Sequence, residues 1–427
     1  MITFSNIETK IEDSKGGLQK RTCHDTGLNM VNYHKNMVLT ATNDDMKKFS
    51  LQFRSVIFSK DMQRVLCFAP PKSIPLSDLA STKVGEESII AEEIIEGTMI
   101  NLFYDTDNGC WEIATKNRIG AGVKFFRDKD GNGKTFRQMF QEALAYINLD
   151  HMSLDKHYCY SFVMQHPDNN IIRYIENPKL YLVAVYLCTF DFATKTNTIT
   201  KVSMEEIKKT NMFDHSCVEF PRLFEKWADL ETLLANWSLF FSKEEFPYVP
   251  GIMLSGDSMR SKYRNPSYEY LRTLRGNQPK LQFHYLTLRK EYRVLEYLKF
   301  FPYHKTEFDR FAKEVEEYTF QLMDYYNGCF TSKEPDALLQ KLVSSPRNYA
   351  KFGRQISLLL ETLPFTDNNK GDDLEYDDDD YGDGYYQDDQ DDQDDQENDN
   401  EAVITYTDMG NYINTLPVPL LMHLVNL

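Results

Sequence analysis

Residues 96–104 read EGTMINLFY and residues 111–116 read WEIATK, and both runs have the composition of β-strands. Apolar and aromatic side chains dominate each run. Between them, residues 105–110 are rich in Asp, Asn and Gly, which are typical of turns. Two strands separated by a turn are therefore predicted at this point of the chain.

Similar short runs lie on both sides of this pair, at Ser50–Phe58, Tyr158–Met164 and Leu180–Leu187. They are bounded by Gly, Pro, Asn or Asp, which favours an antiparallel or mixed sheet. Between them, apolar residues recur at helical spacing within Thr135–Ile147, so one helix is expected there.

Beyond Leu288 the apolar spacing becomes that of amphipathic helices, interrupted by prolines. The fold class predicted is α+β, with an antiparallel-rich core, a C-terminal helical domain and a disordered acidic tail. The predicted segments are an N-terminal extension at 1–36, the core domain at 37–288, the helical domain at 289–365, a disordered acidic linker at 366–402 and an apolar C-terminal segment at 403–427.

The net charge of −17 is concentrated in one place. Of the 65 acidic residues, 17 lie in Asp372–Glu401, which contains no Lys or Arg, and the other 48 are balanced by 48 basic residues. The body of the protein is therefore neutral, and the acidic segment is expected to be a solvated polyanion. A charge of this kind does not exclude a phosphate-binding groove in the body.

The seven cysteines are scattered singly, with no CxxC pair and no histidine at zinc-site spacing. This pattern indicates reduced thiols and no structural zinc. Residues 1–30 lack an apolar signal run, and no stretch reaches the ~18 apolar residues of a spanning helix. An intracellular protein that is neither secreted nor membrane-spanning is therefore expected.

Several of these stretches, taken in order, resemble the motifs of RNA ligases in the covalent nucleotidyltransferase superfamily. The relatives implied are ligases of the phage tRNA-repair type and ligase-like proteins of large DNA viruses. The resemblance covers roughly Phe53–Asn277. The stretches that carry it are residues 53–58 and 68–73 as first strands, 96–104 and 111–116 as the first motif and its following strand, 160–172 as the middle motif, 180–186 as the next strand, 250–254 as the fourth motif and 262–268 as the basic last motif.

The resemblance also identifies what this chain lacks. An RNA ligase needs a lysine whose amine attacks the α-phosphate of ATP, three residues before the glycine of the first motif. That position is Ile94, and the positions of two further carboxylates hold Val163 and Pro250. No catalytic residue is therefore predicted, although Lys72, flanked by prolines, is the best candidate for a relocated nucleophile. No metal ligands are predicted.

The resemblance implies ligand contacts at the residues that remain. The predicted nucleotide- or RNA-binding residues are Glu96, Gly97, Lys116, Arg118, Lys262 and Arg264.

Three functional hypotheses follow. The first is a catalytically inactive, RNA-ligase-like protein that binds RNA or nucleotide through a basic groove. The second is an active ATP-dependent RNA ligase with a relocated lysine, which would use ATP and Mg²⁺ as cofactors. The third is a viral structural protein with a relic ligase fold, located in the cytoplasm, a virus factory or the virion.

Several other stretches of the sequence also have simpler interpretations. Residues 128–133 and the Gly131–Thr135 run resemble calcium and phosphate loops, but both lack the full motif and indicate a polar turn. The basic and aromatic stretch Arg260–Arg293 suits either a nucleic-acid groove or a solvated face. Protein partners are expected at the acidic tail and at residues 403–427. A second hypothesis for the tail is that it competes with nucleic acid for the basic stretch. A second interpretation of residues 403–427 is a terminal element that closes the helical domain. No membrane partner is expected.

Overall fold

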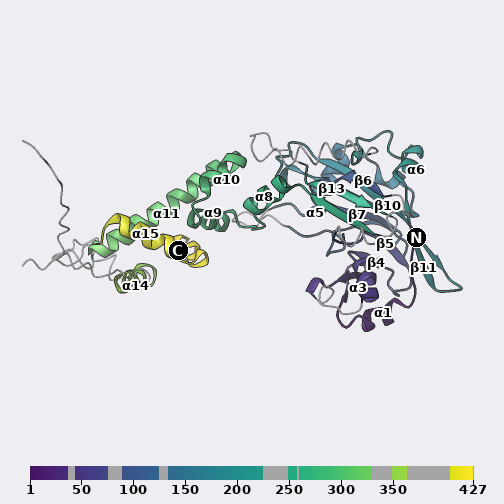
Figure 1. The fold of residues 1–427 in the computed structure, drawn as a ribbon, viewed down its shortest axis with the longest axis horizontal. Coiled ribbons are helices and arrows are strands. Elements are labelled where there is room, and N and C mark those ends of the chain that lie inside the picture. Colours follow the sequence, from purple (N-terminus) through teal and green to yellow (C-terminus); the bar gives the residue numbers. More distant parts are fainter. Residues whose placement is uncertain are drawn as a thin grey trace, which may run out of the picture. The chain divides into compact units, whose positions relative to one another are not determined.

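The computed structural model describes residues 1–36, 44–75, 89–124, 133–224, 249–256, 259–328, 349–362 and 404–426. The chain forms two compact units, Met1–Lys280 and Leu281–Leu427, which we describe separately. The first is built on antiparallel sheets and the second is helical (Figure 1). The predicted α+β fold is therefore confirmed. The acidic linker at 366–402 lies outside the described residues.

The first unit contains three sheets, and every pair of neighbouring strands among its described residues is antiparallel. The six-stranded sheet has the order β1 (Ile2–Phe4), β11 (Thr196–Val202), β10 (Lys179–Asp191), β9 (Tyr158–Gln165), β7 (Thr98–Asp105) and β8 (Cys110–Ala114). The second has β12 (Leu223–Phe224), β6 (Ile90–Glu93), β13 (Gly251–Ser255) and β14 (Arg260–Arg264). The third has β2 (Leu18–Thr22), β3 (Asn29–Tyr33), β4 (Val56–Phe58) and β5 (Val65–Phe68).

The six-stranded sheet is covered on both faces. Helix α5 (Phe136–Tyr146) begins at a capping box formed by Thr135 and Gln138, and packs its apolar side on one face. The third sheet packs on the other face, where Phe68 contacts Tyr186 at 5.0 Å between ring centroids. The described helices that complete this unit are α1 (Ile7–Asp13), α3 (Asp44–Leu51), α6 (Met204–Lys209) and α8 (Pro266–Arg275).

One expected strand differs from the structure. The run Ser50–Phe58 was expected to be one strand, but Ser50 and Leu51 end helix α3, and β4 begins only at Val56. Phe49 in this helix and Phe53 just after it both pack on Phe4 of β1, with centroid distances of 5.9 and 4.8 Å, so contacts with a distant strand hold the helix in place.

Residues 1–36 are not a separate extension of the first unit. Strand β1 forms an edge of the six-stranded sheet, and β2 and β3 make half of the third sheet. Ile2 and Phe4 are buried while Thr3 between them is exposed, so the period-2 pattern of a half-buried strand was present in the sequence.

The second unit begins at residue 281, whereas the predicted boundary was 288/289. Its described helices are α9 (Leu281–Lys290), α10 (Val294–Phe300), α11 (Lys305–Tyr326), α14 (Arg354–Thr362), α15 (Tyr406–Thr415) and α16 (Val418–Val425). Aromatic rings such as Tyr285 and Phe308, at 5.1 Å, fill the space between the helices. No described helix is both long enough and apolar enough to cross a membrane.

The apolar C-terminal segment packs inside this helical unit. Lys290 of α9 donates to the carbonyl of Thr415 at 3.1 Å, and the Arg289 guanidinium donates to Asn414. Met409, Ile413, Leu421 and Leu424 are buried. The segment therefore closes the helical unit, which was one of the two interpretations of its sequence.

Candidate functional site

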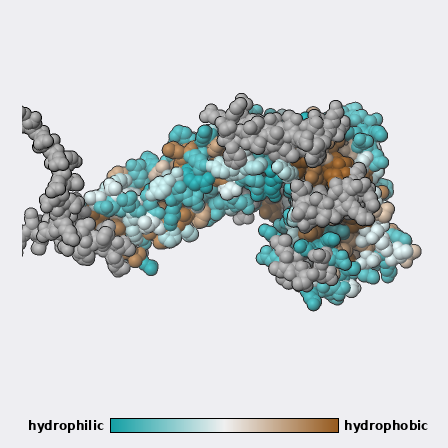
Figure 2. Space-filling model, in the orientation of Figure 1, coloured by the Kyte–Doolittle hydropathy of each residue, from teal (hydrophilic) through white to brown (hydrophobic). Residues whose placement is uncertain are grey.

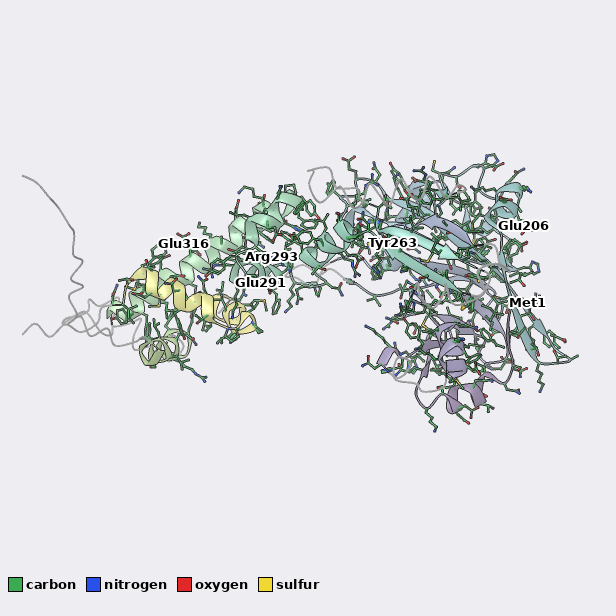
Figure 3. All side chains as sticks on the ribbon, in the orientation of Figure 1. Met1, Glu206, Tyr263, Glu291, Arg293 and Glu316 are labelled. Atoms are coloured by element: carbon green, nitrogen blue, oxygen red, sulfur yellow. The ribbon has the colours of Figure 1, made fainter. Side chains whose placement is uncertain are left out.

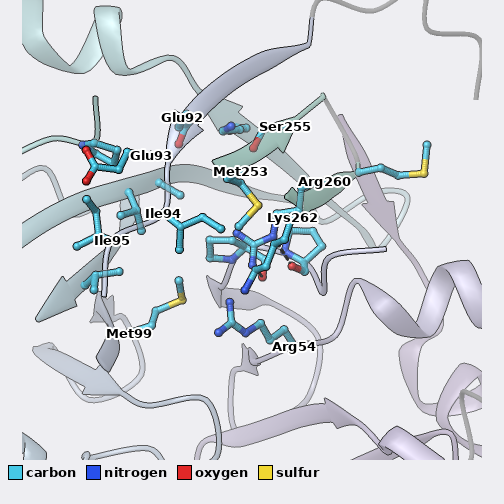
Figure 4. A pocket seen from close by; sticks show the side chains of 18 of the residues that line it. Arg54, Glu92, Glu93, Ile94, Ile95, Met99, Met253, Ser255, Arg260 and Lys262 are labelled. Carbon is cyan, nitrogen blue, oxygen red and sulfur yellow. Dashed lines mark hydrogen bonds between the residues drawn. The ribbon is translucent and has the colours of Figure 1, made fainter. Parts of the chain in front are cut away.

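A cavity of about 190 Å³ lies in the first unit where β6 and the segment after it meet β13 and β14 (Figure 4). One wall is apolar and includes Ile94, Met99 and Met253, and another is cationic. Strands β7, β9 and β10 also contribute to its lining. Figure 2 shows hydrophobic residues gathered on the visible face of this unit in the region where Figure 1 labels β7, β10 and β13.

The cationic wall begins with the alternation of strand β14, which reads Arg-Ser-Lys-Tyr-Arg from Arg260. Because successive side chains of a strand point to opposite faces, Arg260, Lys262 and Arg264 share one face, while Ser261 is buried on the other. Cross-strand pairing sets Met253 opposite Lys262 and Glu92 opposite Met253. Glu92, Met253 and Lys262 thus form one row on the sheet face that lines the cavity.

Asn265 and Pro266 end this strand and start helix α8. The Asn265 side chain accepts from the backbone of Ser267 and donates to the carbonyl of Val249 at 3.0 Å. Pro266 occupies the first helical position, where its missing N–H is not needed. The last cation of the strand, Arg264, is therefore exposed, and it pairs with Glu269 in the first turn of α8.

Two further cations come from the third sheet and the segment after it. Lys72 is brought beside β14 because Ile74 pairs with Ser261, whose hydroxyl donates to the Ile74 carbonyl at 2.9 Å. Arg54 is placed by Asn32, whose amide donates to the Arg54 carbonyl at 2.8 Å and to the Lys116 carbonyl at 2.7 Å. Figure 4 shows the Arg54 and Lys262 side chains converging on the same space.

Apart from Arg264, these cations have no acidic partner among the described residues. Arg54, Lys72 and Lys262 form no ion pair there, and Arg260 donates only to the carbonyls of Pro71, at 2.6 Å, and Pro70, at 3.2 Å. Glu92 is the nearest carboxylate of the row, and burial raises its pKa, which disfavours its charged form. The described lining therefore holds four cations, Arg54, Lys201, Arg260 and Lys262, against two carboxylates, Glu92 and Glu93, whose charged forms burial disfavours.

Burial and mutual repulsion both weaken the protonated forms of these groups. Burial, and after it repulsion by Arg260, Arg54, Arg264 and Lys72, together lower the pKa of Lys262 to about 7. Burial likewise lowers the pKa of Arg260 to about 10 and, together with neighbouring cations, that of Lys72. An anion that entered the cavity would relieve this repulsion, as expected for an anion-binding site.

Two of the three positions at which the resemblance expects a catalytic residue or a metal ligand line this cavity. Ile94 lines it, with its backbone N–H donating to the carbonyl of Gly251 at 2.8 Å. Val163 of β9 also lines it, while Pro250 precedes β13 and accepts from the Asn265 N–H. None of these three side chains carries a nucleophile or a metal ligand.

Of the predicted binding residues, the structure places Gly97 and Lys262 in the lining of the cavity. Lys116 lies near Arg54, which helps to lower its pKa after burial, and its ammonium is 5.0 Å from the centroid of the Tyr33 ring. Arg264 lies beside Lys262 on β14. Arg118 is exposed and does not line the cavity; its backbone carbonyl accepts from Thr115 at 2.9 Å.

Glu96 points away from the cavity into a buried hydrogen-bond network. One carboxylate oxygen accepts from the backbone N–H of Ile172 at 3.0 Å and of Arg173 at 3.1 Å. The other accepts from the Tyr268 hydroxyl at 2.7 Å. Glu96 thereby joins the start of β7, the segment after β9 and helix α8 around the cavity.

Replacing Glu96 by alanine is expected to destabilise the first unit strongly. The change leaves two backbone donors and one hydroxyl buried without an acceptor, at roughly 1–3 kcal/mol each. We expect a loss of roughly 3–5 kcal/mol in the free energy of unfolding, measured by urea denaturation. Glu112→Ala on β8, a part-buried ion-pair partner of Arg137, is the comparison. An equal, small effect of both substitutions would contradict the role assigned to Glu96.

Sequence reasoning did not single out Arg54 or Glu92 as binding residues, and it named Arg260 only as the first cation of the stretch Arg260–Arg293. For Arg260 a signal was available, because the alternation Arg260-Ser261-Lys262-Tyr263-Arg264 places three cations on one face of any strand. For Arg54 no local signal exists, since it follows a helix and reaches the cavity only through the packing of the third sheet.

The basic stretch Arg260–Arg293 divides between the two units. Tyr263 lies on β14 of the first unit, whereas Arg293 lies in the second, beside Glu291 (Figure 3). Arg293 also pairs with Glu296 at 2.7 Å. The cations after residue 280 therefore have partners within the helical unit.

A second group of ionisable side chains is already occupied by a lysine. Ligand atoms of Glu142, His166 and Asp168 lie within 4.8 Å of one another. The Lys134 ammonium contacts Glu142 at 2.7 Å and Asp168 at 2.9 Å, and so holds the place that a cation would take. We assign no metal to this group. The calcium-like run at 128–132 lies outside the described residues.

No protein-family model matches the sequence, and no curated protein matches it. Solved structures similar to the chain are ATP-dependent ligases. A proposed ATP-dependent DNA ligase from Aquifex aeolicus is 14% identical, with a TM-score of 0.39, over 81% of this chain and 89% of its own. One form of an archaeal ATP-dependent RNA ligase is 14% identical, with a TM-score of 0.39, over 72% and 75%. Another is 13% identical, with a TM-score of 0.40, over 74% and 79%.

Proposed function

We propose that this chain binds the phosphate groups of RNA or of a free nucleotide in the cation-lined cavity, and that it forms no covalent nucleotide adduct at the ligase position. The observation that carries the proposal is the convergence of Arg54, Arg260 and Lys262 in the lining of the cavity, where none of them has an ion-pair partner among the described residues. Desolvated cations of this kind destabilise a folded protein unless an anion binds between them.

The size of the cavity supports a phosphate group as its occupant. Pockets that enclose whole drug-sized ligands have volumes of about 300–1,000 Å³, which exceeds the 190 Å³ found here. The cavity thus suits a phosphate-bearing part of a longer molecule, with the remainder outside. Its apolar wall, with Ile94 and Met253, gives a ribose or base a surface for contact.

The inactive assignment rests on the residues at three positions. Isoleucine at 94 has no atom that attacks phosphorus, and valine at 163 and proline at 250 offer no carboxylate for Mg²⁺. Two amines near the cavity, Lys72 and Lys262, keep the alternative of a relocated nucleophile open to test. A purely structural, virion-associated role is the outcome if no phosphate ligand binds.

The test is to incubate the purified chain with radiolabelled ATP and Mg²⁺, and in parallel with radiolabelled RNA. We expect salt-sensitive retention of RNA or ATP on filters and no labelled protein on a denaturing gel, because position 94 has no nucleophile. A labelled band that Lys72→Ala or Lys262→Ala abolishes would replace our proposal by the active-ligase hypothesis. Absence of both binding and label would leave the structural role. For RNA, the logarithm of the binding constant falls with the logarithm of salt by about 0.7 per phosphate contacted.

A further inference from the structure

We propose that Cys159 and Cys188 are a redox-sensitive pair, which a hydroperoxide oxidises to a disulfide, and that this bond displaces Tyr186 in the wall of the cavity. Formation of the disulfide is independent of the proposed function, whereas its effect on ligand binding rests on that function. In the sequence the cysteines are scattered singly, so the pair is a product of the fold.

The two cysteines come from neighbouring strands of the six-stranded sheet. Cys159 lies on β9 and Cys188 on β10, and their sulfur atoms are 3.9 Å apart. Cys159 is paired with Tyr186, so Cys188, two residues further along β10, lies on the same face of the sheet. This face packs on the third sheet, where Cys67 of β5 joins the same cluster. Three thiols are therefore gathered between the two sheets.

The environment of the two sulfurs differs. Cys159 is buried, with 2% of its surface exposed, whereas Cys188 is partly exposed, so an oxidant from solvent reaches the pair at Cys188. The Cys159 sulfur accepts from the backbone N–H of Phe68 at 3.3 Å, which favours its thiolate.

Hydrogen bonds within the cluster separate the acidities of the two thiols. Burial opposes ionisation of Cys159, but hydrogen bonds from the Cys188 and Cys67 thiols and from the Phe68 N–H lower its pKa. The contact with Cys159, and then burial, raise the pKa of Cys188. The fold thus favours a thiolate on Cys159 beside a thiol on Cys188, and a thiolate is the species that forms disulfides.

The oxidation takes two steps. Cys188 passes its proton to Cys159, and the Cys188 sulfur attacks hydrogen peroxide, so that an S–O bond forms and the O–O bond breaks. The hydroxide that leaves takes the proton from Cys159 and becomes water. The Cys159 thiolate then attacks the Cys188 sulfur, the S–S bond forms, and the S–O bond breaks. The second hydroxide takes a proton from solvent, so two thiols are oxidised while one peroxide is reduced to two waters.

The disulfide requires a local shift of the strands. Diagonal neighbours on antiparallel strands lie about 7–8 Å apart, whereas the Cα atoms of a disulfide are usually about 5.5–6 Å apart. Strands β9 and β10 must therefore approach each other beside Tyr186, which lines the cavity. Tyr186 also packs on Phe68, at 5.0 Å between ring centroids, and Phe68 shortly precedes the two prolines whose carbonyls hold Arg260. Oxidation thereby reaches a cation of the cavity.

The first measurement is peptide mapping of the full chain after treatment with hydrogen peroxide, alkylation of free thiols and tryptic digestion without reduction. Trypsin separates Cys67, Cys159 and Cys188 into three peptides, because basic residues flank each of them. The cleavage sites are Arg64, Lys72, Lys156, Arg173, Lys179 and Lys195. We expect a linked pair of peptides that joins Cys159 to Cys188 and that dithiothreitol separates.

Two further measurements test the effect on the cavity. Hydrogen exchange of the peptides that contain Tyr186 should be faster in the oxidised protein, because the shift disturbs the hydrogen bonds between β9 and β10. Filter retention of radiolabelled RNA should fall roughly tenfold, the cost of about one hydrogen bond from a charged donor such as Arg260. Dithiothreitol should restore both.

Cys188→Ser and Cys110→Ser are the matched variants. Cys188→Ser should bind RNA like the reduced, unmodified protein and respond to peroxide in neither measurement. Cys110→Ser, at an exposed cysteine of β8, should respond like the unmodified protein. Thermal melting establishes that each variant is folded, and Cys188→Ala replaces the serine variant if that one is not.

Oxidation of Cys110 by peroxide without a Cys159–Cys188 link, or a link from Cys67 to Cys159 in its place, would overturn the assigned pair. The expected link with unchanged hydrogen exchange around Tyr186 would overturn the displacement. Failure of the proposed function is a different result, in which the reduced protein retains no RNA while the link and the faster exchange still form. A link and faster exchange that both disappear in Cys188→Ser support the inference.

Discussion

Replacing Arg54 by methionine should lower the affinity for a phosphate ligand by roughly 10- to 100-fold while leaving the stability of the free protein unchanged or higher. A hydrogen bond from a charged donor contributes about 1.5–3 kcal/mol, which corresponds to that loss. The free protein gains because burial already weakens the charged form of Arg54, and no described carboxylate compensates it. Methionine keeps the apolar stem and removes the unpaired charge.

The measurement is filter binding of a phosphorylated ligand together with a thermal melt. Arg118→Met is the matched control, because Arg118 is exposed and does not line the cavity, and it should change neither quantity appreciably. If Arg54→Met bound as tightly as the unmodified protein, Arg54 would not contact the ligand. If it melted at a lower temperature, Arg54 would instead have a structural partner that stabilises the fold.

Replacing Gly251 by alanine is expected to destabilise the first unit by roughly 2–5 kcal/mol and to abolish phosphate binding. Gly251 starts β13 with φ of +150°, a conformation that strains any residue with a side chain. An added Cβ would lie 2.3 Å from the carbonyl oxygen of Tyr263 on the paired strand. Because Tyr263 adjoins Lys262, β14 must shift to admit the methyl group, and Lys262 shifts with it.

Urea denaturation measures the loss of stability, and filter binding of radiolabelled RNA measures the loss of binding. Gly122→Ala is the control, since a Cβ there meets no atom within 4 Å. That variant should retain both stability and binding. Normal stability and binding in Gly251→Ala would mean that β13 and β14 are not held as closely as the 2.3 Å approach indicates.

Much of the fold was predictable because it depends on local pattern. The strands at 98–105, 110–114, 158–165 and 179–191 and the helix at 136–146 all lie where residue type and spacing placed them. The exception at Ser50–Phe58 is instructive. Its aromatic residues suit a strand or a helix equally well, and the helix that forms places Phe49 against Phe4, far earlier in the chain, with Phe53 packed on the same ring just after the helix.

The candidate site was predictable only in part. The sequence alone shows that position 94 holds an isoleucine and that Lys262 and Arg264 alternate with other residues. The sequence does not show that Glu96 is buried beneath Tyr268, because the two residues are separated by 172 positions. The resemblance predicted that Glu96 contacts a ligand, whereas in the structure its carboxylate accepts three internal hydrogen bonds.

The sequence by itself determined the α+β character of this protein, its neutral body and acidic segment, and the absence of a nucleophile at position 94. These properties depend on residue type and on neighbours a few positions away. Only the tertiary structure decided which cations share one cavity. Arg260 reaches the carbonyl of Pro71 across 189 positions, and Arg54 comes from the segment just before β4, which belongs to a different sheet. Such convergence depends on how whole sheets pack, and no local pattern encodes it.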